Sequence, residues 1–120
     1  MKPLVPSRIA ELLFATVLGY VGISWHIMNA HGMSGLIPDY MPGDPKTWVY
    51  ISGIGFVLTA LAIITGIMKT LGCYLLAAMI LVFAFTKHLQ PAIDGNTFQL
   101  VNDLVFAIAA ILIGNRGTKN

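Results

Sequence analysis

Four apolar stretches, each close to the length that crosses a bilayer, limit what this chain can fold into. They cover residues 9–28, 48–68, 71–85 and 98–113, and none of them contains a proline. A membrane-spanning helix needs about 20 predominantly apolar residues. Helices satisfy their backbone hydrogen bonds locally, whereas an open sheet cannot satisfy its edges in lipid and four short strands cannot close a barrel. The pattern predicts an all-α membrane protein, a bundle of four transmembrane helices.

The composition favours lipid over water as the surrounding solvent. Of the 120 residues 57% are hydrophobic and only 10% are charged, and the mean hydropathy is +0.80. Soluble domains carry about 25% charged residues. Because the connections are short, we expect residues 1–120 to form one transmembrane domain, with helices at about 8–30, 48–68, 70–87 and 98–114. The basic residues are scattered, which indicates the bilayer rather than nucleic acid as the partner.

Basic residues are distributed unevenly between the two ends of the predicted bundle. Five of them fall on one side: Lys2, Arg8, Lys69, Arg116 and Lys119. Only Lys46 and Lys87 fall on the other side. Cytoplasmic segments of membrane proteins carry the excess of Lys and Arg. Both termini are therefore predicted to be cytoplasmic. The connections after the first and third helices then face the outer side.

Polar side chains from three predicted helices reach the same level near that outer side. His26 lies at the end of the first helix, His88 at the end of the third, and Asn102 and Asp103 near the start of the fourth. A carboxylate inside a membrane costs several kcal/mol if it faces lipid. We therefore expect Asp103 to point inward, with His88 or Lys87 as its partner, and predict a polar pocket at this level.

Four interpretations of this pocket remain open. In the first, His26 and His88 are structural and hydrogen-bond to Asp103, Asn102 and Ser24. In the second, the pocket binds a quinone or a similar lipid-soluble molecule, whose carbonyls accept hydrogen bonds from histidine. In the third, His26 and His88 ligate a b-type haem between facing helices. In the fourth, Asp103 and His88 relay protons.

Two further residues near the predicted cytoplasmic side are informative, Glu11 in the first helix and Cys73 at the start of the third. Glu11 lies one turn from Arg8 and at the level of Lys69 and Arg116, which predicts an ion pair between Glu11 and Arg8. Cys73 is the only cysteine, so an intrachain disulfide or a cysteine-built metal site is excluded. We predict no metal site and no certain cofactor, and the sequence contains no complete catalytic set.

Three short segments resemble the DoxX and DoxX-like family of small membrane proteins. They are residues 45–54 entering the second helix, with Trp48-Val49-Tyr50, residues 87–91 ending the third, with His88-Leu89-Gln90-Pro91, and residues 100–104 opening the fourth, with Asn102-Asp103. Gln90 departs from the family's His-Leu-Pro form. The resemblance implies a four-helix fold in a bacterial inner membrane, and it adds Trp48 to His26, His88, Asn102 and Asp103 as a pocket residue.

The resemblance also implies association with respiratory or redox complexes, including a thiosulfate to quinone oxidoreductase. On this basis we expect an accessory or scaffold subunit of a membrane complex, which binds a larger membrane-protein partner or forms a homo-oligomer. The alternative is a quinone-interacting oxidoreductase subunit. In that alternative His88 and Asp103 manage protons while a partner supplies electrons.

Overall fold

Four long helices form the protein in the computed structural model, which describes residues 1–116. The helical spans are Ser7–Ile27, Pro45–Thr65, Lys69–Ile93 and Phe98–Asn115, and each is long and apolar enough to cross a membrane. Residues 1–116 contain no strand. The prediction of an all-helical chain with four candidate spans is confirmed.

Two of the spans are built from more than one kind of helix. The first is α1 (Ser7–Tyr20) continued by the π-helical segment η1 (Val21–Ile27), and α2 (Ala30–Met33) and the 3₁₀ turn η2 (Ser34–Leu36) follow it. The second span is α3 (Pro45–Thr65). The third is α4 (Lys69–Phe83), the π-helical segment η3 (Ala84–His88) and α5 (Leu89–Ile93), and the fourth is α6 (Phe98–Asn115).

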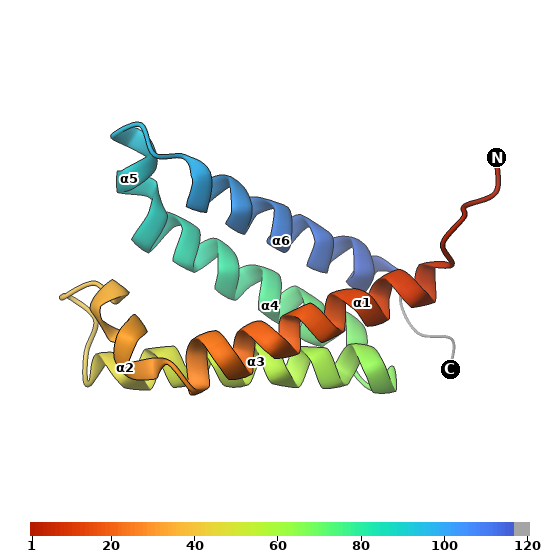
Figure 1. Ribbon diagram of the computed structural model, residues 1–120, viewed down its shortest axis with the longest axis horizontal. Helices are drawn as coiled ribbons and strands as arrows, with labels where there is room; N and C mark the ends of the chain where they lie inside the picture. The colour runs from red at the N-terminus through yellow and green to blue at the C-terminus, as the bar shows by residue number, and fades with distance from the viewer. Residues whose placement is uncertain (117–120) are drawn as a thin grey trace.

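The helices are arranged as two pairs (Figure 1). α1 and η1 pack along α3, and α4 packs along α6, while the short turn from α3 to α4 joins the pairs. The pairs diverge towards the end that carries α2 and α5, which we call the distal end. The opposite end, where the N-terminus and the end of α6 lie, is the proximal end. The two ends therefore present different environments.

Local sequence signals determine where α3 begins and ends. Pro45 occupies the first turn, and the Asp44 side chain accepts a hydrogen bond of 3.0 Å from the backbone N–H of Lys46. Gly66 ends the helix with a φ of 78°, a left-handed conformation that glycine adopts without steric cost. The helix thus covers 45–65 rather than the predicted 48–68, because the cap and the glycine outweigh the limits of the apolar run.

The third span is longer than the sequence predicted. The helix was expected to end near residue 87, with Pro91 in a turn, but helical structure continues to Ile93. Pro91 is the third residue of α5, which begins after the π-helical segment. A proline in a first turn lacks an N–H that has no intrahelical acceptor in any case, so it does not stop the helix.

Small residues allow the helices to approach closely. A Cβ added to Gly53 of α3 would lie 2.9 Å from the carbonyl oxygen of Gly22 in η1 and 2.7 Å from the Cβ of His26. The fully buried core is aliphatic and small, and includes Ala15, Leu18, Ala60, Ile63, Cys73, Ala77, Ala107 and Ala110. Close backbone contact of this kind stabilises helix association where lipid removes the hydrophobic driving force.

Five hydroxyl side chains within the spans bond to their own helices. The hydroxyls of Thr16, Ser52, Thr59, Thr65 and Thr86 each donate to the carbonyl oxygen four residues earlier, at 2.6 to 2.9 Å. Such bonds satisfy the hydrogen-bonding capacity of the hydroxyls within the helix, so that these groups do not need a partner in an apolar surrounding. The isolated Thr and Ser residues are therefore compatible with membrane-spanning helices.

Candidate functional site

Both π-helical segments lie towards the distal end, and each carries one of the two candidate histidines. η1 contains His26 and η3 contains His88. In η1 the backbone N–H of Met28 donates to the carbonyl of Ile23, 2.8 Å away and five residues earlier. π-Helical turns are rare and occur frequently at functional sites. The two segments, which lie in different helix pairs, are the first reason to look for a site here.

His26 is buried against α3. Its Nδ1 lies 3.0 Å from the carbonyl oxygen of Val21, and its ring stands edge-on to the Phe56 ring with centroids 4.8 Å apart. A carbonyl oxygen only accepts, so Nδ1 carries the proton and donates it. In the neutral ring Nε2 is then a hydrogen-bond acceptor. Within residues 1–116 no hydrogen bond to Nε2 is found.

His88 and Asp103 form a direct hydrogen-bonded pair between η3 and α6. The bond joins His88 Nδ1 to Asp103 Oδ2, and the two side chains are only 22% and 19% exposed. The carboxylate fixes the orientation of the imidazole and leaves His88 Nε2 available to another partner. The pair also joins the distal halves of the third and fourth spans.

Lys87 adds a positive charge beside this pair. Its Nζ lies 4.8 Å from the centroid of the Phe83 ring, a cation–π contact. Within residues 1–116 no carboxylate lies within 4 Å of the ammonium group. Lys87 thus brings a positive charge next to His88 in the sequence without forming an ion pair of its own.

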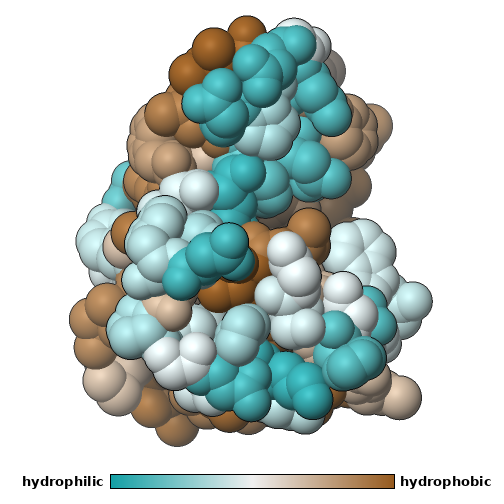
Figure 2. Space-filling model, turned by 90° about the vertical axis from the view of Figure 1, so that its left-hand side faces the viewer, coloured by the Kyte–Doolittle hydropathy of each residue, from teal (hydrophilic) through white to brown (hydrophobic). Residues whose placement is uncertain are grey.

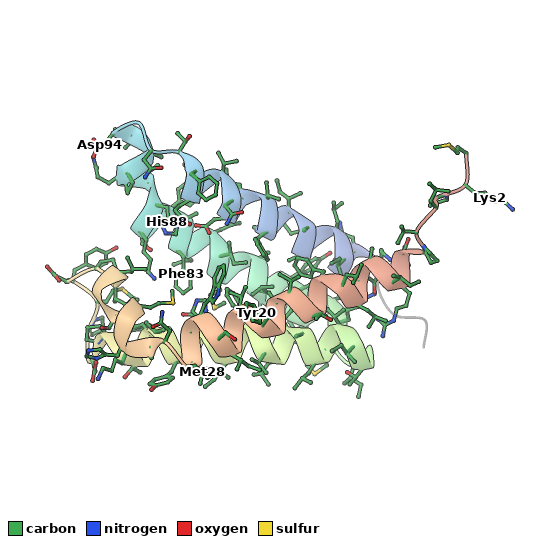
Figure 3. The ribbon with its side chains drawn as sticks, viewed as in Figure 1. Lys2, Tyr20, Met28, Phe83, His88 and Asp94 are labelled. Carbon is green, nitrogen blue, oxygen red and sulfur yellow. The ribbon has the colours of Figure 1, made fainter. Side chains whose placement is uncertain are left out.

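His26 on the first span and Phe83, Lys87, His88 and Asp103 on the third and fourth spans all lie towards the distal end, and we call these five residues the distal cluster. Figure 3 shows Phe83 on the side of the third span that faces η1 and α2, whereas His88 bonds to Asp103 in α6. Figure 2, which views the molecule from the distal end, shows apolar atoms between two groups of hydrophilic residues. The cluster therefore lies where an apolar interior meets a polar end.

The structure does not bring all five predicted pocket residues together. Asn102 lies on the exposed side of α6, and within residues 1–116 it makes no side-chain hydrogen bond. Trp48 packs with Ile37 and Val49 under the first connection, where its Nε1 donates to the Pro42 carbonyl at 2.8 Å. The helical register separates Asn102 from its neighbour Asp103, because adjacent residues on a helix point about 100° apart.

Phe56 and Gly53 of α3 are neighbours of His26 that the sequence did not predict. Gly22 precedes His26 by four residues and therefore shares its helical face. That spacing is the signal that identifies this face as the contact with α3. The partner positions on α3 depend on the register between two helices, which no local pattern in either helix specifies.

At the proximal end Glu11 is buried within a cluster of three bases. Lys69 Nζ and Arg8 Nη1 lie 3.1 and 3.4 Å from Glu11 Oε1, and Arg116 Nε lies 2.5 Å from Oε2. Arg8 also donates to the carbonyl oxygens of Ile63, at 2.7 Å, and of Ile64, at 2.5 Å, in the last turn of α3. The sequence predicted the contact of Glu11 with Arg8, but not that Glu11 and Arg8 together connect all four spans.

An apolar groove of about 500 Å³ lies between α3 and α4 and extends to the turn that joins them. Its walls include Leu58, Leu61, Leu75 and Met79, and Gly55 and Gly72 form part of its floor. Its polar groups are threonine hydroxyls that already bond to backbone carbonyls. The described lining of the groove can enclose an apolar molecule but supplies no further polar group to fix its orientation. The distal cluster is therefore the better candidate for a specific ligand.

The resemblance to the DoxX family is corrected by comparison with known families. A family described as "Domain of unknown function (DUF8561)" matches residues 14–110. The segments that suggested DoxX lie at the ends of apolar helices, where aromatic, histidine and proline residues are common in unrelated membrane proteins. No curated protein and no solved structure matches the chain.

Proposed function

The chain belongs to the DUF8561 family, and from the geometry of the distal cluster we propose that it is a multi-pass membrane protein that binds a neutral lipid-soluble molecule of the quinone class. The bound molecule carries a carbonyl or hydroxyl head. The chain acts as an accessory subunit that holds this molecule for a larger membrane partner. The single observation that supports this function best is the half-buried His88–Asp103 pair, which is preceded by the Lys87 ammonium in contact with the Phe83 ring.

Charge balance favours a neutral ligand. The distal cluster contains one ammonium and one carboxylate, Lys87 and Asp103, and two imidazoles. The formal charges cancel when the imidazoles are neutral. An anionic head would meet the Asp103 carboxylate, and a cationic head would meet Lys87, so each would lose part of its electrostatic gain. A carbonyl or hydroxyl head avoids both conflicts.

The hydrogen-bonding groups suit both redox forms of such a molecule. The Lys87 ammonium donates, as a quinone carbonyl requires, whereas the unprotonated Nε2 of His26 accepts, as a quinol hydroxyl requires. The rings of Phe83 and Phe56 flank these groups and offer aromatic surface for a planar head. An isoprenoid or alkyl tail would extend into the surrounding lipid.

The role of an accessory subunit follows from the chemistry of these side chains. His, Lys and Asp move protons and position substrates, but they do not transfer electrons. A redox reaction of the bound molecule therefore requires a partner that supplies the electrons. We further propose that the proximal end, which carries Arg8, Lys69 and Arg116, faces the cytoplasm and that the distal cluster lies near the outer leaflet.

The test is equilibrium binding of a short-tailed quinone to the full chain in nanodiscs made of zwitterionic lipid. We expect Lys87→Met to weaken binding by roughly 10-fold or more, because it removes a charge-assisted hydrogen bond. Lys46→Met is the matched control, since Lys46 lies at the same end outside the cluster, and should bind like the wild type. Equal affinity in all three proteins would overturn the site. Quinone reduction by the isolated chain with a soluble electron donor would overturn the accessory role.

A further inference from the structure

The proximal cluster contains more positive charge than its carboxylate can neutralise. Both oxygens of Glu11 are occupied, Oε1 by Lys69 and Arg8 and Oε2 by Arg116. Glu11 is 2% exposed and supplies one negative charge against three positive charges. Two positive charges are therefore left without a counter-charge among these four residues.

The excess positive charge lies at the surface, on the guanidinium groups of Arg8 and Arg116. The side chains of Arg8 and Arg116 are 47% and 51% exposed, whereas the Lys69 side chain is only 4% exposed. Because both arginines contact the same carboxylate, their guanidinium groups lie close together. A guanidinium presents a planar set of donors that matches the oxygens of a phosphate.

The other contacts at this end place the two arginines at one level. Arg8 is in the first turn of α1 and binds the end of α3, and Arg116 directly follows α6. Thr70 at the start of α4 donates to the Gly114 carbonyl at 2.8 Å, and Tyr74 donates to the side-chain oxygen of Asn115. These bonds fix the end of α6 against α4. All four spans thus begin or end at the level of the proximal cluster (Figure 1).

We propose that Arg8 and Arg116 form a binding site for the phosphate of an anionic phospholipid in the leaflet next to the proximal end. This inference rests on the bilayer insertion proposed above. In a bilayer crossed by these four helices, their common end lies at the depth of the lipid headgroups. A zwitterionic phospholipid brings its own positive charge to that layer, whereas an anionic one has a net negative charge that offsets the excess. The Glu11 carboxylate holds the two guanidinium groups in place and leaves their outer faces to the lipid.

The experiment compares lipid classes on the intact chain. The purified protein in zwitterionic micelles is titrated with phosphatidylglycerol or with phosphatidylcholine of the same chain length, and bound lipid is counted by native mass spectrometry. We expect a preference for phosphatidylglycerol that falls roughly fivefold in Arg116→Gln, the change that corresponds to about one surface base. Arg8→Gln provides a second variant if Arg116→Gln does not fold. Arg116→Lys retains the charge and should keep most of the preference.

Lys46→Gln is the control, since it removes a base at the distal end and should leave the preference unchanged. The same preference in Arg116→Gln, in Arg8→Gln and in the wild type would overturn the site. Inorganic phosphate that displaces phosphatidylglycerol at equal concentration would also overturn it, because the site would then recognise a soluble anion. Flotation with phosphatidylcholine liposomes separates this inference from the proposed function. A chain that inserts but shows no lipid preference contradicts only the inference, whereas a chain that does not insert contradicts the membrane function as well.

Discussion

Lys69 and Glu11 form an ion pair of 3.1 Å in which both side chains are almost fully buried, although the two residues are 58 positions apart. The pair joins the first span to the third at the proximal end. Arg8 extends the connection to α3 and Arg116 extends it to α6. At the distal end the two helix pairs are separate and a smaller cluster lies near their opening. The protein is thus firmly joined at one end and open at the other.

Glu11→Gln should strongly destabilise the fold. The substitution leaves the buried Lys69 ammonium without its counter-charge, and breaking a buried pair from one side costs about 3–5 kcal/mol. Thermal unfolding in detergent, followed by circular dichroism, measures the loss. Asp39→Asn is a suitable control, since Asp39 is an exposed carboxylate in the first connection. A melting temperature equal to that of the control would contradict the structural role of Glu11.

Gly53→Ala should separate η1 from α3. The added Cβ would lie 2.7 Å from the His26 Cβ and 2.9 Å from a backbone oxygen, so one helix must move. Overpacking of this kind costs about 1–3 kcal/mol. Gly35→Ala is the control, because a Cβ at that position meets no atom within 4 Å. Unfolding midpoints report the difference, and equal stability of the two variants would show that the close approach is absent.

His88→Gln and Asp103→Asn should have effects that do not add. Each substitution removes one partner of the same hydrogen-bonded pair, so the second change costs less once the first has been made. For residues in direct contact the coupling is about 0.5–3 kcal/mol. A double-mutant cycle of unfolding free energies measures it. Strict additivity would mean that the two side chains do not interact.

Cysteine labelling should place the two ends of the bundle on opposite sides of the membrane. In a Cys73→Ala background, Asp39→Cys and Asp94→Cys probe the distal connections and Ile67→Cys probes the turn between α3 and α4. All three positions are exposed. The positive-inside distribution predicts that an impermeant maleimide reaches the first two in intact cells and the third only after permeabilisation. Labelling of Ile67→Cys together with Asp94→Cys in intact cells would contradict the topology.

Local sequence signals were sufficient for some features of the site and not for others. The apolar stretches predicted the four helices. The free-energy cost of a carboxylate that faces lipid predicted that Asp103 points inward, where it bonds to His88. His26 was expected near the same carboxylate, but its Nδ1 bonds to the carbonyl of Val21 in its own helix. This choice depends on the π-helical turn of η1. π-Helical turns are rare and occur mostly as single turns within α-helices, and the apolar pattern of residues 9–28 did not indicate one.

The sequence by itself determined that four helices form, where α3 is capped by Asp44 and ended by Gly66, and which end of each helix carries the basic residues. These features depend on neighbours within one helical turn or on the solubility of each segment. Only the tertiary structure decided that Glu11 contacts three bases, that His88 pairs with Asp103, and that Trp48 and Asn102 lie apart from this pair. Those relationships depend on the rotation and spacing of one helix against another. Many small packing contacts between distant residues fix that geometry together, so it cannot be read from any single segment.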